Sequence, residues 1–377
     1  MPERPSQATY RRRRLVALGA LLLFVVLVVA VVSGGGDDSG GAESASEELP
    51  PWLPEEPTRL TIAASGDLLI HSPVFFQALA DGGGATYDFK PMLTQVREIV
   101  RAADVGICHL EEPLTDGEPH GEPTFMAPAS LAGDIKWVGW DVCSNASNHS
   151  YDAGEDGVRF TIKRLDKEGI AHSGTNARPG TSRAAIVKAK GLKVALLAYT
   201  TKIIGMGDLE KEFLLNMADP KTMLADAKAA RKAGASVVIV SVHWGDEYVH
   251  EPSDLQRSLA RKLTASPNVD AVIGQHVHVV QPIRRVNGKP VVYGEGNLLS
   301  NQTAACCPPE SQDGMVVLLD VVAGPKGVKV ERVRYVPTWV QHPGFEVIRS
   351  TGESRDRTIG YAGQDEPWLA PEPAPSG

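Results

Sequence analysis

The chain has 377 residues and a formal net charge of −8 at pH 7, and 42% of its residues are hydrophobic. This length can build one large domain or two smaller ones, and the even spread of the motifs favours one. The negative charge is not the footprint of a nucleic-acid-binding protein, which would need a basic patch or stripe, so we expect no nucleic acid partner. Four cysteines are too few for a disulfide framework in so long a chain. Cys108 and Cys143 lie near predicted strand ends, where they either pair in an oxidising compartment or remain buried thiols.

The N-terminal region has the pattern of a membrane anchor. A basic segment at 1–14 ends in four arginines, and an uninterrupted apolar run follows at 15–32. As a transmembrane helix this run is about 27 Å long, and the arginines place residues 1–14 in the cytoplasm. We favour a retained single-pass anchor at the cell membrane over a cleaved signal that releases a secreted protein, because the cleavage site at 31–33 is imperfect. Residues 33–58 are typical of a flexible linker, so the rest of the chain is expected outside the cytoplasm.

From residue 59 onward strands alternate with helices, which is typical of an α/β fold with mostly parallel sheets. Buried-strand patterns occur at 60–64, 105–108, 137–144, 194–199, 236–242 and 269–273. Helical spacing occurs at 91–102, 154–169, 220–233 and 253–265. Strands that we expect to be antiparallel follow at 279–286, 291–293, 315–321 and 328–336, with turns at Asn287-Gly288 and at 324–327. Charge, glycine and proline then return, so we predict a domain at 59–345 and a disordered tail at 346–377.

Polar side chains follow the predicted strands at five places. At 271–278 an apolar run leads through a glycine into His276 and His278. Neutral imidazole is the commonest protein ligand for zinc, iron and similar ions, and two imidazoles in a strand-exit loop have little structural use. The loops at strand ends of an open α/β sheet meet at one edge. We therefore predict a metal centre, and the other four strand ends supply Asp67, Glu111, Asn148 with His149, and His243.

These residues belong to six motifs whose order resembles that of the CapA family, capsule-synthesis proteins linked to poly-γ-glutamate. The motifs are Gly66-Asp67-Leu68-Leu69-Ile70-His71, Leu110-Glu111-Glu112-Pro113-Leu114, Asn148-His149-Ser150-Tyr151-Asp152-Ala153-Gly154, His243-Trp244-Gly245-Asp246-Glu247-Tyr248, Gly274-Gln275-His276-Val277-His278 and Tyr293-Gly294-Glu295-Gly296-Asn297. The resemblance covers about residues 59–340. It implies a calcineurin-like metallophosphatase fold, a layered sandwich of mixed β-sheets flanked by helices, here preceded by one transmembrane helix.

The resemblance also implies a centre of two divalent metal ions, which would be manganese, zinc or iron. Two neighbouring ions activate water and stabilise charge on an attacked phosphoryl or acyl oxygen. The Glu111 carboxylate would bridge them, and His149 would protonate a leaving group while Asp152 orients its ring. The implied metal ligands are Asp67, Glu111, Asn148, His243, His276 and His278.

Three further residues are weaker candidates for the site. His71 ends the first motif but is as readily an incidental residue as a ligand. Glu247 is as readily explained by a salt bridge in its loop. Asn297 belongs to the glycine-asparagine pair that the last motif retains.

The chain departs from the family pattern in three of the motifs. The family usually has asparagine where this chain has His109, and a second asparagine where it has Ser147, and Glu295 and Leu298 alter the surroundings of the last motif. None of these departures removes an implied ligand. They change the groups around the ligands, and so the metal preference.

We predict an extracytoplasmic protein that acts in synthesis, export or anchoring of an envelope polymer of the poly-γ-glutamate type, through a metal-dependent hydrolase or transferase centre. Its expected partners are the anionic polymer or its precursor, the membrane through the N-terminal helix, and other capsule synthesis proteins. Two alternatives stay open: a non-catalytic polymer-binding accessory of an envelope assembly complex, and a general metallophosphoesterase. The residues do not distinguish an amide from a phosphoester substrate, because activated water can attack either.

Overall fold

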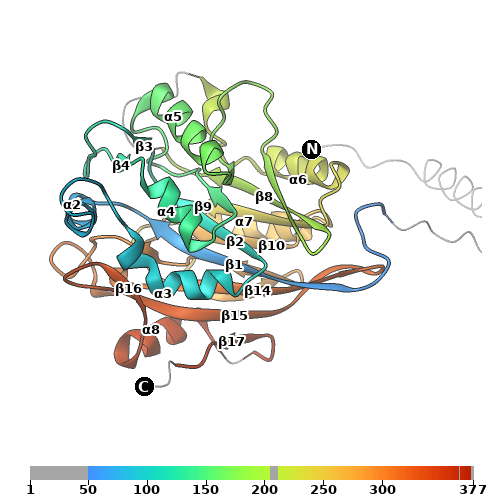
Figure 1. Cartoon of the computed structure of the whole chain (residues 1–377). Helices are drawn as coiled ribbons and strands as arrows, with labels where there is room; N and C mark the ends of the chain where they lie inside the picture. Colours follow the sequence, from blue (N-terminus) through green and yellow to red (C-terminus); the bar gives the residue numbers. More distant parts are fainter. Residues whose placement is uncertain (1–49, 204–210, 365, 375–377) are drawn as a thin grey trace, which may run out of the picture. The chain divides into compact units, whose positions relative to one another are not determined.

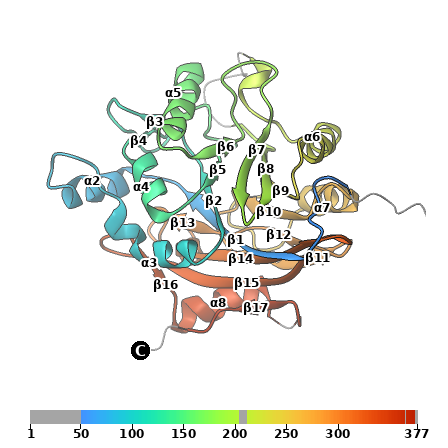
Figure 2. The same ribbon diagram turned by 45° about the vertical axis from the view of Figure 1, so that its right-hand side comes forward.

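Two β-sheets pack face to face, and helices cover their outer faces (Figures 1 and 2). The computed structural model describes residues 50–203, 211–364 and 366–374. Among these residues, no helix is both long enough and apolar enough to span a bilayer. The predicted membrane segment at 15–32, the basic segment before it and most of the predicted linker lie outside the described residues.

The larger sheet has a parallel half and an antiparallel half that meet at β1 (Thr58–Leu68). The parallel half continues through β2 (Val105–Leu110), β5 (Val142–Ser144) and β6 (Ala171–Ser173). The antiparallel half consists of β14 (Asp313–Gly324), β15 (Gly327–Gln341) and β16 (Glu346–Arg349). Two short strands, β13 (Asn297–Leu299) and β17 (Leu369–Pro371), pair in parallel with β1 and β15.

The smaller sheet is parallel at its centre and antiparallel at both edges. Its centre contains β8 (Leu192–Thr200), β9 (Val237–His243), β10 (Ala271–Gln275) and β12 (Lys289–Val292). Its edges are β7 (Ala184–Ala189) and β11 (Ile283–Val286). The predicted turn between β11 and β12 is confirmed: Asn287 and Gly288 have φ of 50° and 79°, as a two-residue hairpin turn requires. A separate pair, β3 (Leu114–Thr115) and β4 (Ala127–Pro128), lies between β2 and α4 in the chain.

Helices cover the two outer faces of the sandwich, as Figure 2 shows. On the outer face of the larger sheet lie α2 (Ser72–Asp81), α3 (Lys90–Arg101) and α4 (Leu131–Val138), with α5 (Gly154–Lys167) packing on β3 and β6. On the outer face of the smaller sheet lie α6 (Pro220–Lys232) and α7 (Asp254–Ala265), and α7 begins at a capping box formed by Ser253 and Gln256. Two short 3₁₀ turns occur at Glu212–Leu214 and Pro309–Gln312.

The strands are apolar on both faces because each sheet is covered on both sides. In β9, Val237 and Ile239 point into the layer between the sheets, while Val238 and Val240 pack with the side chains of α6 and α7. This alternation follows from the two-residue period of a strand. It explains why the central strands are continuous hydrophobic runs in the sequence.

The predicted strand at 137–144 is wrong in its first half. Residues Trp137 and Val138 form the last turn of α4, which ends at Gly139 with φ of 110°. Only Val142–Ser144 form the strand, β5. A short apolar run does not by itself distinguish the end of a buried helix from a strand.

The predicted disorder at 346–377 is also wrong for most of that segment. It forms β16, α8 (Gly352–Ala362) and β17. Its charged groups make ion pairs with the sheet, such as Arg357 Nε with Asp313 Oδ2 at 2.9 Å, and β17 hydrogen-bonds along β15. The composition of this segment reflects these surface pairs and turns, whereas some of its apolar residues, such as Ala362, are buried and others, such as Ile359, are half-buried.

All four cysteines are paired in disulfides. Cys108 and Cys143 are partners in the register of β2 and β5, with Cα atoms 4.5 Å apart. The adjacent Cys306 and Cys307 form the second pair. The choice left open for Cys108 and Cys143 is therefore resolved in favour of a disulfide.

Candidate metal centre

The parallel strands of both sheets end at one edge of the sandwich, and the six predicted metal ligands lie there. Each is buried, with at most 3% of its surface exposed. They come from five strand ends, and the pattern of buried strands followed by polar loops accounts for their convergence. In chain order they are Asp67 in β1, Glu111 after β2, Asn148 after β5, His243 in β9, and His276 and His278 after β10.

One part of the cluster contains Asp67, Glu111 and His278. His278 Nδ1 lies 3.2 Å from Asp67 Oδ2, and its Nε2 lies 3.9 Å from Glu111 Oε1. His278 Nδ1 also lies 3.0 Å from Asn297 Oδ1. The Asn297 amide nitrogen donates to Gln302 and Ser311, so its oxygen is the group that accepts from His278. Asn297, a weaker candidate in the sequence, thus orients the His278 ring so that Nε2 faces Glu111.

The other part contains Glu111, Asn148 and His243. His243 Nε2 lies 2.7 Å from Asn148 Oδ1 and 3.7 Å from Glu111 Oε1. Neither carboxylate oxygen of Glu111 has a hydrogen-bond partner among the described residues. The side-chain nitrogen of Asn148 also has none there. Glu111 therefore lies between two imidazoles with both oxygens available, which is the position a bridging carboxylate needs.

His276 is held by its backbone and leaves its ring unpaired. Its N–H donates to Asp67 Oδ2 over 3.3 Å, while within the described part of the chain neither ring nitrogen has a partner. Its ring centroid lies 4.6 Å from that of His243. His276 and His278 both have positive φ, 95° and 56°, which costs a residue other than glycine about 1–3 kcal/mol. Backbone strain of this kind clusters at functional sites, and here it aims two imidazoles into one space.

Electrostatics suit this cluster to a cation. Burial, and next the charge of His278, lower the pKa of His276 to about 2. Burial, and next His276, hold the pKa of His243 well below its usual range. Burial, and next the charge of Asp67, raise the pKa of Glu111 well above its usual range. These two imidazoles are thus neutral, the form that binds metal, and a positive neighbour would relieve the buried carboxylates.

The donor set therefore fits divalent metal ions. Two groups of three residues each offer ligand atoms within 4.8 Å of one another: Asp67, His109 and His243, and Glu111, His276 and His278. Imidazole nitrogen with carboxylate and amide oxygen suits zinc, iron or manganese. The unpaired oxygens of Glu111 and nitrogens of His276 are the groups that such ions would satisfy.

His149 and Asp152 form the predicted acid–base pair beside the ligands. His149 Nδ1 lies 2.8 Å from Asp152 Oδ2, which also accepts from the N–H of Phe125 at 2.7 Å. The Phe125 ring packs edge-on against His149, with centroids 4.7 Å apart. Ser147 Oγ accepts from the N–H of His149 and donates to the backbone carbonyl of Glu111. The His149 ring is thus fixed on its Nδ1 side.

The other two weaker candidates lie outside the groups of converging ligand atoms. His71 Nδ1 lies 3.0 Å from the carbonyl of Leu69, and its Nε2 lies 3.7 Å from Glu122 Oε1. Burial, which outweighs that backbone hydrogen bond, lowers the pKa of His71 to about 4. Glu247 is exposed on the loop after β9. His71 therefore lies beside the cluster and Glu247 at its solvent side.

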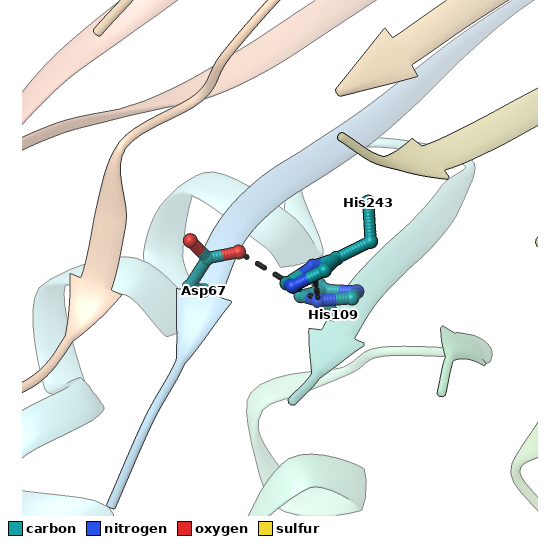
Figure 3. A group of neighbouring side chains, drawn as sticks. All are labelled: Asp67, His109 and His243. Atoms are coloured by element: carbon teal, nitrogen blue, oxygen red, sulfur yellow. Dashed lines mark hydrogen bonds and ion pairs between the residues drawn. The ribbon is translucent and has the colours of Figure 1, made fainter. Parts of the chain in front are cut away.

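His109, which the sequence indicated only as a departure from the family pattern beside the site, lies within the cluster itself. It lies in β2, where every residue is buried, and Figure 3 shows its ring beneath His243 and facing Asp67. Its Nε2 lies 3.0 Å from His243 Nδ1 and 3.7 Å from Asp67 Oδ1. The signal was present in the sequence: residues two apart on a strand share a face, so His109 and Glu111 point the same way.

Comparison with solved structures defines the class of fold. The calcineurin-like phosphoesterase YfkN from Bacillus subtilis matches with a TM-score of 0.51 at 16% identity, over 81% of this chain and 96% of that one. The protein therefore has the calcineurin-like phosphoesterase fold, as the resemblance implied.

Sequence comparison defines the family. The model of the bacterial capsule synthesis protein PGA_cap matches residues 61–302, so the chain belongs to this family. The PGA biosynthesis protein CapA of Bacillus subtilis is 30% identical over 219 residues, 55% of this chain and 56% of that protein. The capsule biosynthesis protein CapA of Bacillus anthracis is 24% identical over 294 residues, 74% of this chain and 70% of that protein. A "Probable polyglutamine synthesis accessory protein" of Mycobacterium tuberculosis is 27% identical over 53% of this chain and 56% of its own length.

Proposed function

We propose that this protein is a metal-dependent hydrolase or transferase that acts outside the cytoplasm on an anionic envelope polymer of the poly-γ-glutamate type. One observation carries the proposal: six buried donor side chains from five strand ends converge, and among them Glu111 has two oxygens without a partner among the described residues. An unpaired buried carboxylate is costly, so a protein keeps such a group where a cation binds.

The residues divide into binding and proton-transfer roles. Asp67, Glu111 and His278 would hold one cation, and Glu111 with Asn148, His243 and His276 a second. Cations at such a site supply Lewis-acid stabilisation of an attacked phosphoryl or acyl oxygen and activate water. His149 lies beside these ligands with Nδ1 bound to Asp152, so its Nε2 can deliver a proton to a leaving oxygen or nitrogen.

The family and its relatives support the choice of polymer. Two relatives are named for capsule or PGA biosynthesis and one for polyglutamine synthesis. We infer from these names that the partners are the anionic polymer or its precursor and other capsule synthesis proteins.

The N-terminal sequence and the disulfides support the proposed location. Residues 15–32 have the length and apolarity of a membrane anchor, and four arginines precede them, the arrangement that favours a cytoplasmic N-terminus. Both disulfides belong to the part of the chain that follows this segment, and disulfides persist in oxidising compartments. We therefore propose a single-pass anchor with the domain outside the cytoplasm.

A non-catalytic role is the second candidate, favoured by the word "accessory" in the name of the Mycobacterium tuberculosis relative. In that case the metal centre would hold the strand-end loops in place for polymer binding. The two candidates differ in turnover and agree in metal content.

Metal analysis of the full-length protein is the first test. The protein purified without chelator should contain two equivalents of transition metal, and chelated protein should rebind Mn²⁺ or Zn²⁺. Absence of metal together with absence of binding in titration refutes the catalytic proposal.

A substrate screen then separates the reactions. Metal-loaded protein is incubated with phosphomonoesters, phosphodiesters and γ-linked glutamyl peptides, with the Glu111→Gln variant as the inactive control. Release of glutamate that depends on Glu111 supports the proposal. Release of phosphate alone identifies a phosphoesterase, and metal binding with no turnover identifies the accessory role.

A further inference from the structure

We propose that His109 is a positioning residue, which accepts a hydrogen bond from the Nδ1–H of His243 so that His243 Nε2 can bind a cation. The inference rests on the metal centre proposed above and concerns a residue at which this chain departs from the family pattern. Figure 3 shows the two rings together with Asp67.

The two imidazoles meet through their nitrogen atoms. His109 Nε2 and His243 Nδ1 are 3.0 Å apart, while the ring centroids are 5.0 Å apart with 26° between the ring planes. The centroids are thus 2.0 Å farther apart than the nitrogens, so the rings meet edge to edge and not face to face. One nitrogen donates a proton to the other, because neutral imidazole has one donor and one acceptor.

His243 faces a different group on each side. Its Nε2 lies 2.7 Å from Asn148 Oδ1 and 3.7 Å from Glu111 Oε1, so this nitrogen faces the proposed ligands. Its Nδ1 lies 3.0 Å from His109 Nε2. A neutral His243 has one proton, which either lies on Nε2 and is donated to Asn148 or lies on Nδ1 and is donated to His109. Only the second form leaves a lone pair for a cation.

Behind His109, a series of buried polar side chains continues the hydrogen bonding. His109 Nδ1 lies 3.1 Å from Ser144 Oγ, which lies 3.1 Å from Ser241 Oγ. Ser241 Oγ lies 2.9 Å from Gln275 Oε1, and Gln275 Nε2 donates to Glu295 Oε2 over 3.0 Å. The bond to Glu295 identifies the Gln275 oxygen as an acceptor. Each of these side chains is at most 1% exposed.

Every donor in this series of buried side chains keeps an acceptor, whichever nitrogen of His243 carries the proton. When His243 donates to His109, then His109 donates to Ser144, Ser144 to Ser241, and Ser241 to Gln275. When His243 instead donates to Asn148, then Ser144 donates to His109, and His109 donates to His243. A hydroxyl donates in either direction, so no buried donor is left without an acceptor in either case. Cation binding at Nε2 thus leaves no N–H unpaired in this series of side chains.

The geometry favours this role over direct ligation by His109. Its Nε2 is closer to His243 Nδ1 than to Asp67 Oδ1, 3.0 Å against 3.7 Å. Its Nδ1 is already bound to Ser144, the residue opposite it in the register of β2 and β5. A nitrogen that accepts from His243 has no lone pair left for a metal ion.

Substitution of His109 in the full-length protein tests the proposal. His109→Leu removes the acceptor, whereas His109→Gln offers an amide oxygen near the former Nε2. Ser144→Ala removes the next group in this series and is the second route if His109→Leu does not fold. His172→Leu is the matched control, because His172 is a partly buried histidine on β6 that pairs with Asp166. Circular dichroism establishes folding of each variant, and titration with Mn²⁺ after chelation gives affinity and stoichiometry.

The expected result is about a 10- to 100-fold weaker affinity in His109→Leu, with two ions still bound at saturation. His109→Gln and His172→Leu should bind close to the wild-type affinity, and Ser144→Ala should lie between. NMR of the Zn²⁺-loaded protein with labelled histidine provides an independent readout. The Nδ1–H resonance of His243 should be shifted downfield by its hydrogen bond, and this shift should disappear in His109→Leu.

Three outcomes overturn the inference, and they are distinguishable. Equal affinities of wild type and His109→Leu show that His243 needs no acceptor. Loss of one bound ion in both His109→Leu and His109→Gln makes His109 a direct ligand. Failure of the wild type itself to bind Mn²⁺ or Zn²⁺ removes the proposed metal centre, whereas the first two outcomes leave it in place.

Discussion

Replacing Glu111 with glutamine should stabilise the metal-free protein and abolish its response to metal. Glu111 is fully buried, and neither of its oxygens has a hydrogen-bond partner in the described structure. Burial, followed by the charge of Asp67 and then that of Glu112, raises the pKa of its carboxyl. Glutamine has nearly the same shape and no charge, so it removes this repulsion without opening a cavity.

The size of the effect follows from the unpaired carboxylate. Leaving a buried polar group without a partner costs about 1–3 kcal/mol, and more for a charged group. The glutamine amide would still be unpaired, so the metal-free variant should gain only the excess that the charge adds, on the order of 1 kcal/mol. With saturating metal, the wild type should instead be more stable than the variant. A ligand at 100 times its dissociation constant stabilises the folded state by about 2.7 kcal/mol, and the variant should lose this gain.

The difference in unfolding free energy between the variant and the wild type, both without metal, should also depend on pH, and the pKa of Glu111 gives its direction. Burial holds the pKa of Glu111 in the folded protein well above its ordinary value of 4.5. The protonated carboxyl therefore contributes stability that is fully present below about pH 4.5. This stability is lost as the pH rises through the folded-state pKa. Glutamine does not titrate, so the advantage of the variant without metal should grow with pH.

Urea unfolding of both full-length proteins, with chelator and with saturating Mn²⁺, measures these differences at several pH values. Glu98→Gln is the matched control, since it makes the same chemical change at an exposed position on α3. A variant that is less stable than wild type in chelator would show that the Glu111 carboxylate has a stabilising partner other than metal. A variant stabilised by Mn²⁺ as strongly as wild type would remove Glu111 from the metal centre.

Three further predictions concern the acid, the strand ends and the anchor. His149→Ala should reduce turnover about 10²- to 10⁴-fold with metal content nearly unchanged, measured by kinetics and elemental analysis, and loss of both together would make His149 a ligand. Gly66→Ala should lower the free energy of unfolding by about 1–3 kcal/mol and weaken Mn²⁺ binding, because its Cβ would lie 1.9 Å from the carbonyl of Gly296, next to Asp67. Gly133→Ala in α4, whose Cβ would meet no atom within 4 Å, should instead stabilise by about 0.5–1 kcal/mol, and equal melting temperatures for the two variants would contradict this reasoning. Cell fractionation should find the full-length protein in the membrane and a variant lacking 15–32 in the soluble fraction, and recovery of both in the soluble fraction would exclude the anchor.

The central strands could be predicted because their signal is local. The apolar run of β9 and the paired histidines after β10 follow from the burial of parallel strands on both faces. The predicted ligands converge because such strands end at one edge of the fold. The boundary between α4 and β5 was missed because apolar residues such as Val138 and Val142 continue across it, and Gly139 is the only local sign of a break.

The sequence alone determined which side chains end the strands, which faces are apolar, and that several imidazoles and carboxylates would meet at one edge. These properties depend on spacing along the chain and on the parallel direction of the strands. Only the tertiary structure decided that His109 bonds to His243, that Asn297 orients His278, that α8 packs on β14 and β15, and that β17 pairs with β15. Each of these contacts joins segments far apart in the chain, and its geometry depends on strand register and on how the two sheets are packed, which no local pattern encodes.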